Sequence, residues 1–371
     1  MTPQPMVAPY LDATPIFEFF RGNHATELLT AAVAHFRLFE RFPEGPKAFD
    51  DLRRELELAE RPARVLTTAL AAMKLLELDS EGRVGPTELA REHLTPGAHF
   101  DVSGYVGLAA DAPGVVEMVE RLRTNRPAGA DDGKGTAFIF REGLTSAMEE
   151  AASARSLTLA LAGRARNVAP LLAERFPLDG VRTLLDVAGG TGIYSIAWLL
   201  RHPDLHATVW DLPHVLEVAR EMADAHGVGD RLECIPGDMF TDAVPTGAEA
   251  VLLSNVLHDW DVPECIELIR RCAHALPVGG RILIHDVFLD DSLDGPLPIA
   301  LYSAALFRLC EGRAYSAAEY GFMLREAGMT PGTVVPTGIH CGVLPAIKTA
   351  DSPVDDGSNP DSGGQGDSIL T

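Results

Sequence analysis

The chain has 371 residues, enough for two domains, and its 46% hydrophobic and 23% charged residues are typical of a globular protein rather than a fibrous or wholly disordered one. The formal net charge of -22 argues against nucleic acid as a partner, because binding to its phosphates needs a basic surface. No apolar run approaches the roughly 18 residues of a membrane span, and residues 1–15 lack the basic start and apolar core of a signal peptide, so we expect a cytoplasmic protein with no membrane partner.

The cysteines and histidines show no pattern of a disulfide or a metal site. The cysteines form no CxxC pair and each lies in an apolar stretch, so we expect buried, reduced thiols at Cys234, Cys265, Cys272, Cys310 and Cys341. The histidines include no HExxH motif or other close ligand spacing. The sequence therefore predicts no metal centre.

The first part of the chain is predicted to be helical and to end in a small hairpin. Apolar residues recur at intervals of three and four over residues 15–43, and Phe49–Leu56 and Pro62–Leu76 are two further helical segments. Asp79–Val84 has the composition of a β-hairpin tip. Three helices followed by a hairpin is the element order of a winged helix, so we assign residues 1–100 to a winged-helix-like domain.

A winged helix is often a reader of DNA, which makes a regulator one alternative for this domain. Between Asp50 and Asp79 there are five basic residues against seven acidic ones. The segment in the place of a recognition helix, Pro62–Leu76, consists mostly of Ala, Leu, Thr and Val, which suits packing rather than base contacts. We therefore favour a dimerisation domain, whose apolar helices contact a second subunit in a homodimer.

The middle of the chain, residues 101–176, is predicted to be a helical linker that also lines the substrate site. Val102–Arg123 and Ser146–Phe176 have helical patterns. The loop between them, Pro127–Gly135, is rich in Gly and Asp. The second helix is expected to lead into the next domain, whose boundary is the turn Pro177–Gly180.

From residue 177 to 348 the pattern alternates between short apolar strands and helices. The strands are expected at Leu184–Val187, Ala207–Trp210, Leu232–Ile235, Ala250–Leu253 and Arg281–Val287, with a late pair near Thr333–Val335 and Gly342–Ile347. Parallel strands with crossover helices and a terminal hairpin indicate an α/β fold, a doubly wound Rossmann-like sheet. Residues 349–371 contain five aspartates and no basic residue, and we expect a disordered acidic tail.

A glycine-rich turn follows the first strand of this sheet. Gly189, Gly190 and Gly192 allow a ligand to approach the backbone closely, and Asp211 ends the next strand, where such folds hold a ribose diol. A dinucleotide and S-adenosylmethionine are both compatible with this turn. However, the position of a third dinucleotide-binding glycine is Ser195, and Asp186 would repel a pyrophosphate but suit an ammonium group. The cationic ligand is therefore favoured.

Polar residues follow the third and fourth strands as well. Asp238 and Met239 come just after the third strand, where a carboxylate suits an adenine amino group and an apolar side chain suits its ring. Ser254 and His258 come just after the fourth. Because open α/β sheets bind ligands at the carboxyl ends of their strands, we expect these residues to lie around one crevice.

The segments LLDVAGGTG, WDLPHV, GDMF, LHDWD and GRAYS together resemble a known family. Nearly the whole chain up to Lys348, including the helical dimerisation domain, is similar to the class I S-adenosylmethionine-dependent O-methyltransferases of the caffeate, isoflavone and hydroxyindole type and to the polyketide-tailoring enzymes of bacteria. The resemblance implies bound S-adenosylmethionine, an intertwined homodimer, and a histidine base that takes a proton from a hydroxyl group of a small-molecule substrate.

The resemblance also implies roles for individual residues. Gly189, Gly190 and Gly192 would border the amino-acid part of the cofactor, Asp211 and Leu212 would hold its ribose and adenine edge, and Asp238 and Met239 would complete the adenine site. His258 matches the family's base, and Asp286 matches the acid beside it. Candidates for the acceptor pocket, for which core packing is the commoner role, are Phe138, Phe140, Met148, Phe307 and Met323.

Three positions depart from the family's pattern. Ala314 stands where a second flanking glutamate is common, Ser254 stands where a lysine often meets the cofactor, and Ala188 replaces a first glycine.

We predict an O-methyltransferase that acts on an aromatic or polyketide-like hydroxyl. The missing glutamate keeps open a relative that binds the same cofactor but catalyses hydroxylation or decarboxylation, and a ligand-sensing regulator is the alternative outside enzymes.

Overall fold

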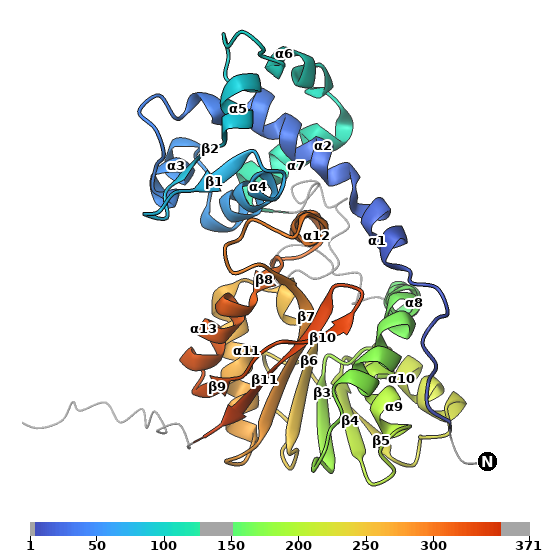
Figure 1. The fold of residues 1–371 in the computed structure, drawn as a ribbon. Coiled ribbons are helices and arrows are strands. Elements are labelled where there is room, and N and C mark those ends of the chain that lie inside the picture. Colours follow the sequence, from blue (N-terminus) through green and yellow to red (C-terminus); the bar gives the residue numbers. More distant parts are fainter. Residues whose placement is uncertain (1–3, 127–150, 350–371) are drawn as a thin grey trace, which may run out of the picture.

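The computed structural model describes residues 4–126 and 151–349, with side chains described from residue 155 onward in the second range. A helical part formed by residues 14–126 lies above an α/β part, residues 4–13 run down beside the α/β part, and helix α12 (Leu297–Leu309) lies between the two parts (Figure 1). Phe138, Phe140, Met148 and the acidic tail beyond Thr349 lie outside the described residues.

The helical part contains the expected hairpin and two of the expected helices, whereas the expected helical region 15–43 is divided into two α-helices, a π-helical turn and a 3-10 turn. Its helices are α1 (Thr14–Arg21), α2 (Asn23–Thr30), α3 (Phe49–Glu55), α4 (Glu60–Ala72), α5 (Glu88–His93), α6 (Ser103–Val106) and α7 (Pro113–Thr124), with a π-helical turn at Ala31–His35 and 3-10 turns at Leu38–Glu40 and Gly107–Ala109. Strands β1 (Leu76–Leu78) and β2 (Val84–Pro86) pair antiparallel.

The core of the helical part also includes α12, from a region that the sequence analysis assigned to the α/β domain. Ala304 and Phe307 of α12 pack with Leu28, Leu66 and Met118, and all five side chains are fully buried. Phe307 is therefore a core residue, as the commoner role for such a side chain suggested. Helix α12 packs on α4 of the helical part and also contacts β7 of the sheet. It therefore links the two parts of the chain.

The expected helix Val102–Arg123 is not continuous. It is divided into α6, a 3-10 turn and α7, and α7 begins at Pro113. The residue before a proline is driven out of the helical region, and Ala112 is extended with ψ 135°. Pro113 therefore interrupts the expected helix, and α7 begins at this residue.

The α/β part is a mixed, mostly parallel sheet in the strand order β10-β11-β7-β6-β3-β4-β5. Its strands are β3 (Thr183–Val187), β4 (His206–Asp211), β5 (Leu232–Pro236), β6 (Ala250–Ser254), β7 (Arg281–Leu289), β10 (Val335–Gly338) and β11 (Cys341–Lys348). The first five are parallel, and β11 pairs antiparallel with both β7 and β10. This confirms the predicted doubly wound sheet with a terminal hairpin.

Two short strands were not predicted: β8 (Tyr315–Ser316), which pairs with β7, and β9 (Met329–Pro331), which pairs with β11. The order reverses at β3, which lies between β4 and β6. Crevices at such reversal points, at the carboxyl ends of the strands, are where doubly wound sheets bind ligands. The sheet therefore places the glycine-rich turn after β3 at that point.

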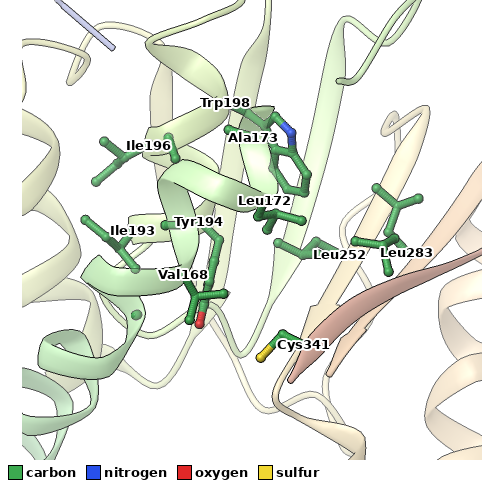
Figure 2. Packing of buried hydrophobic residues seen from close by; sticks show 14 of the residues in the cluster. Val168, Leu172, Ala173, Ile193, Tyr194, Ile196, Trp198, Leu252, Leu283 and Cys341 are labelled. Atoms are coloured by element: carbon green, nitrogen blue, oxygen red, sulfur yellow. The ribbon is translucent and has the colours of Figure 1, made fainter. Parts of the chain in front are cut away.

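Helices cover both faces of the sheet (Figure 1). They are α8 (Ala151–Arg175), α9 (Ile193–Leu199), α10 (Pro213–Ala225), α11 (Val262–Ala275) and α13 (Ala317–Glu326). Alternate residues of β6 point to opposite faces, so Leu252 packs with α8 and α9 whereas Leu253 packs with α11 and α13. Figure 2 shows the first of these clusters, in which Leu172 and Trp198 lie beside Leu252 and Leu283.

The cysteines are reduced, and Cys265, Cys272, Cys310 and Cys341 are buried as predicted, whereas Cys234 is half-buried in the middle of β5. Met323 on α13 packs in the core on the second face of the sheet, so it also has the commoner role. Among the described residues, no helix is long and apolar enough to cross a bilayer.

Helix α8 provides a matched test of the core. Leu172 is fully buried in the cluster of Figure 2, whereas Leu161 on the same helix is 60% exposed. We expect Leu172→Ala to lower the free energy of unfolding by about 2–5 kcal/mol, because it removes buried methyl groups and leaves a cavity. Leu161→Ala should change it by less than about 0.5 kcal/mol. Urea denaturation of both variants measures the difference, and equal effects would contradict the packing.

Candidate functional site

The polar residues singled out in the sequence lie at the carboxyl ends of β3, β4, β5, β6 and β7. Asp186 is fully buried near the end of β3. Its Oδ2 accepts a hydrogen bond of 2.7 Å from Ser195 Oγ on α9. Its buried Oδ1 has no hydrogen-bond partner among the described residues. A buried acceptor left without a donor is costly and marks a place where a ligand can donate.

The glycine turn is shaped around this carboxylate. A Cβ at Gly189 would lie 2.6 Å from Asp186 Cγ, so only glycine fits there. Gly190 and Gly192 have φ of 60° and 66°, in the left-handed region that favours glycine. Ala188 is also left-handed, with φ 50°. A glycine, which the family commonly has at this position, adopts this left-handed conformation without strain, and the small side chain of Ala188 tolerates it.

Asp211 holds the turn from the neighbouring strand. Its Oδ2 accepts from the Gly190 backbone N–H at 2.8 Å, and its Oδ1 accepts from the Leu212 N–H at 2.7 Å. Each carboxylate oxygen has a second lone pair, so the side chain retains capacity to accept from a ribose hydroxyl. Asp186, Gly189, Gly190, Asp211 and Leu212 are thus brought together as expected, although Asp211 is already bonded to the turn itself.

The electrostatics of the two carboxyl groups differ from those of surface aspartates. Burial raises the pKa of Asp186 to about 7, and the hydrogen bond from Ser195 opposes this shift while the charge of Asp211 adds to it. Burial raises the pKa of Asp211 to about 6, against the backbone hydrogen bonds from Gly190 and Leu212. Two ionised carboxylates side by side are costly, so a positively charged ligand is favoured at this place.

The remaining candidates for the cofactor flank the turn. Asp238 is exposed after β5 and its Oδ1 accepts from the Phe240 N–H at 2.7 Å, while Met239 is half-buried. Ser254, at the end of β6, shares a hydrogen bond of 2.8 Å with His285 Nδ1. Asp238 and Met239 follow the strand beside β4, and Ser254 ends the strand on the other side of β3. The group therefore spans the reversal point of the sheet.

His258 lies in the 3-10 turn Leu257–Asp259 directly after β6 and is buried. Its Nδ1 is 2.7 Å from Asp286 Oδ1 on β7. A carboxylate only accepts, so Nδ1 carries the hydrogen and the lone pair lies on Nε2. Asp261, not His258, caps the following helix by accepting from the Val262 N–H at 2.9 Å. His258 therefore does not serve as a helix cap.

Asp286 is held in place by three donors. Besides His258, the Val287 N–H donates to its Oδ1 at 2.8 Å and the Tyr320 hydroxyl donates to its Oδ2 at 3.0 Å. Burial tends to raise the pKa of Asp286, but His258 and these hydrogen bonds lower it below the ordinary value. Asp286 is therefore an anion at neutral pH. The sequence placed His258 and Asp286 together correctly, and it missed Tyr320.

Asp259 is a second carboxyl group beside His258 that the sequence analysis quoted but did not assign. Its Oδ1 lies 3.8 Å from His258 Nε2. Burial raises the pKa of Asp259 to about 6, although His258 acts to lower it. Burial lowers the pKa of His258, but the charges of Asp286 and Asp259 outweigh it, and the net shift is upward. This role of Asp259 could have been expected from the sequence, because Asp259 directly follows His258.

His285 and Ala314 do not contribute groups to His258. His285 points to the opposite face of β7 from Asp286, as alternation predicts, and bonds Ser254 and Thr337. Burial lowers the pKa of His285 to about 3, so it is neutral. Ala314 is fully buried. Within the described part of the chain, no three histidine, cysteine or carboxyl side chains gather as metal ligands.

Comparisons with known proteins identify the family of the chain. A family model described as an O-methyltransferase domain matches residues 133–330. The chain is 36% identical over 318 residues to 3-hydroxy-5-methyl-1-naphthoate 3-O-methyltransferase from Streptomyces sahachiroi, which covers 85% of this chain and 89% of that protein.

Solved structures are similar as well. An O-methyltransferase family 2 protein from Planctomyces limnophilus, in complex with apigenin, is 44% identical with a TM-score of 0.83 and covers 94% of this chain and 100% of that one. Human N-acetylserotonin methyltransferase in complex with SAM is 22% identical with a TM-score of 0.57, covers 93% of this chain and 100% of that one, and supports the fold alone.

The raised pKa of Asp186 predicts a pH-dependent affinity for S-adenosylhomocysteine, which carries an ammonium group. Asp186 must ionise to pair with that group, so affinity should fall by up to about tenfold per pH unit below pH 7. Isothermal titration calorimetry between pH 5.5 and 8 measures this slope. Asp186→Asn should bind weakly with a flatter slope, and the exposed Asp230→Asn should behave as wild type.

The stability of the free protein should change in the opposite direction. A carboxyl group whose pKa is raised on folding stabilises the fold at low pH, and this contribution is lost as pH rises through about 7. The melting temperature of the free protein should therefore fall from pH 5.5 to 8, less steeply in Asp186→Asn, while the rise caused by S-adenosylhomocysteine grows. A ligand-induced rise that is independent of pH would contradict the role of Asp186.

Proposed function

Since the chain belongs to the O-methyltransferase domain family and is an S-adenosylmethionine-dependent O-methyltransferase, we propose that it methylates a hydroxyl group of an aromatic small molecule with His258 as the general base. The observation that carries this proposal is the buried hydrogen bond between His258 Nδ1 and Asp286, which leaves Nε2 as an acceptor. The relative from Streptomyces sahachiroi acts on a hydroxynaphthoate, and the protein from Planctomyces limnophilus binds apigenin, so the acceptor class is an aromatic hydroxyl compound.

The base is needed because a phenol is a weak nucleophile at neutral pH. Its pKa is about 10, so transfer of its proton to a positioned imidazole contributes roughly a hundred- to ten-thousand-fold in rate. Asp286 fixes the orientation of the imidazole ring and stabilises its cation. Asp259 adds a second carboxyl group close to Nε2, in the absence of the flanking glutamate that Ala314 replaces.

The residues at the ends of β3, β4 and β5 fit S-adenosylmethionine. Asp186 Oδ1 would accept from the ammonium group, Gly189, Gly190 and Gly192 would lie against the amino-acid part, and Asp211 and Leu212 would hold the ribose. Asp238, Met239 and Ser254 would complete the site. When bound, the cofactor supplies a methyl group on a positively charged sulfur. Holding the acceptor oxygen in line with that methyl group is worth up to about 7–11 kcal/mol.

Two alternatives have less support. Hydroxylation or decarboxylation would not need a base with a free Nε2 and two carboxyl groups beside it. A regulator would need the segment at Pro62–Leu76 on the surface to enter DNA, but most of α4 is buried and packs against α12. The acidic balance of the chain also opposes DNA binding.

We further propose a homodimer formed by the helical part. Two groups of large apolar side chains are exposed there, Phe19 and Phe20 on α1, at 83% and 81%, and Tyr105 and Leu108 near α6, at 78% and 81%. Monomeric proteins seldom expose such groups, whereas a symmetric dimer buries them on both copies.

Substitution of the α1 group tests the dimer. We expect Phe19→Glu with Phe20→Glu to convert a dimer into a monomer, because each charge would be buried in the interface. Sedimentation-velocity ultracentrifugation measures the state. Phe322→Glu on α13, where the side chain is 49% exposed, is the control and should remain dimeric. A monomeric wild-type protein would contradict the proposal.

Replacement of the base tests the mechanism. His258→Ala should lower kcat by about 10²–10⁴ on any aromatic acceptor, with unchanged affinity for S-adenosylhomocysteine. In the wild type, kcat/KM should fall as pH drops through the pKa of His258, which lies above its ordinary value of 6.5, because the imidazolium cannot accept a proton. Steady-state rates against pH measure both effects. Full activity of His258→Ala with intact ligand binding would show that another group is the base.

A further inference from the structure

Two arginine side chains lie close to His258 and face the same aromatic ring. Cζ of Arg21, the last residue of α1, is 3.7 Å from the centroid of the Tyr302 ring on α12. Cζ of Arg164 on α8 is 5.8 Å from the same centroid. The Tyr302 ring in turn meets the His258 ring edge-to-face at 5.8 Å between centroids. Three helices distant in sequence therefore bring two cations to one side of the base.

Neither arginine forms an ion pair with a carboxylate in the part of the chain that the structure describes. Arg164 donates to two uncharged groups, Asn255 Oδ1 at 2.8 Å and Cys341 Sγ at 3.4 Å. Arg21 contacts the rings of Tyr302 and Phe17. Glu18, the acid on the same helix, instead lies 2.7 Å from His340 Nε2.

The two aspartates near these arginines contact His258 instead. Asp286 accepts from His258, Val287 and Tyr320, and Asp259 lies beside His258 Nε2. Both arginines are half-buried. Burial acts to lower the pKa of Arg164, but the groups around it, Asp286 among them, raise it, so Arg164 is a cation. Because no carboxylate among the described residues contacts either guanidinium group, these two positions are suited to an anion that arrives with a ligand.

The charge of Arg164 also acts against the protonation of His258. His258 becomes a cation when it accepts a proton, and the charge of Arg164 acts to lower the pKa of His258, against Asp286 and Asp259. Burial lowers the pKa of Arg21, and the charge of Arg164 acts in the same direction. An anionic group between the arginines would remove the repulsion at the moment when the acceptor is in place.

We propose that Arg21 and Arg164 bind a carboxylate of the acceptor, so that the preferred substrate is a hydroxylated aromatic acid. Guanidinium groups match a carboxylate with paired hydrogen bonds, and the Tyr302 ring beside them suits a planar aromatic body. The inference rests on the proposed function because it names the class of its acceptor. The methionine carboxylate of the cofactor is the other possible source of the anion, and the position of Arg21 against Tyr302, next to the base, favours the acceptor.

Equilibrium binding separates these sources without relying on turnover. The probes are a set of hydroxynaphthoate isomers and the naphthols that match them without the carboxylate, titrated calorimetrically into the protein saturated with S-adenosylhomocysteine. We expect at least one hydroxynaphthoate to bind about tenfold or more tightly than its naphthol. Arg21→Gln and Arg164→Gln should each remove most of that preference, while the affinity for S-adenosylhomocysteine measured separately stays unchanged.

Two further variants keep the result interpretable. Arg164→Lys retains the charge without the paired geometry and should keep part of the preference. Arg155→Gln, the same substitution on the same helix at a residue bonded to Glu221, should keep all of it. Melting temperatures close to that of the wild type establish that each variant is folded.

The outcomes distinguish this inference from the proposed function. No preference for any hydroxynaphthoate in the wild type would overturn it, even if naphthols are methylated. Loss of affinity for S-adenosylhomocysteine in both glutamine variants, with the acceptor preference retained, would assign the arginines to the cofactor and also overturn it. A carboxylate preference that depends on both arginines would support it even if the hydroxyl group is not methylated.

Discussion

The buried hydrogen bond between His258 and Asp286 is the interaction on which the rest of the site depends. It joins the turn after β6 to β7, and the pairing of these parallel strands brings the two residues close enough for a hydrogen bond of 2.7 Å. Tyr320 reaches the same carboxylate from α13, so the helix on the second face of the sheet also fixes it. Because the bond selects which imidazole nitrogen carries the hydrogen, a feature of the fold determines the chemistry that His258 can perform.

The cofactor site follows a different principle. Asp186 is buried beneath a turn whose glycine leaves no room for a side chain, and one of its oxygens has no donor among the described residues. The free protein therefore bears the cost of a carboxyl group whose pKa is raised to about 7, and a cationic ligand relieves that cost. Arg21 and Arg164 near Tyr302 are the opposite case, because there the groups without a contacting partner of opposite charge are cations. In both places, a charged group that contacts no partner of opposite charge among the described residues indicates the charge of the ligand.

Much of the fold follows from local patterns in the sequence. Short apolar runs with turn residues between them place β3 to β7, and the order of strands and helices implies that their carboxyl ends meet, which brings His258 and Asp286 to one edge. The site is less predictable where it depends on contacts between distant elements. Arg21, Arg164 and Tyr302 belong to three helices and follow no motif, and Tyr320 meets Asp286 only because α13 packs against the sheet. The break at Pro113 could have been anticipated from the restriction that proline places on Ala112.

The fate of the transferred methyl group tests the central claim most directly. The protein is incubated with methyl-labelled S-adenosylmethionine and a panel of aromatic hydroxyl compounds, and the products are identified by mass spectrometry and NMR. The account predicts labelled methyl ether on an aromatic oxygen in an amount equal to the S-adenosylhomocysteine formed. A product that has gained a hydroxyl group or lost carbon dioxide, or label found on carbon or nitrogen, would contradict it.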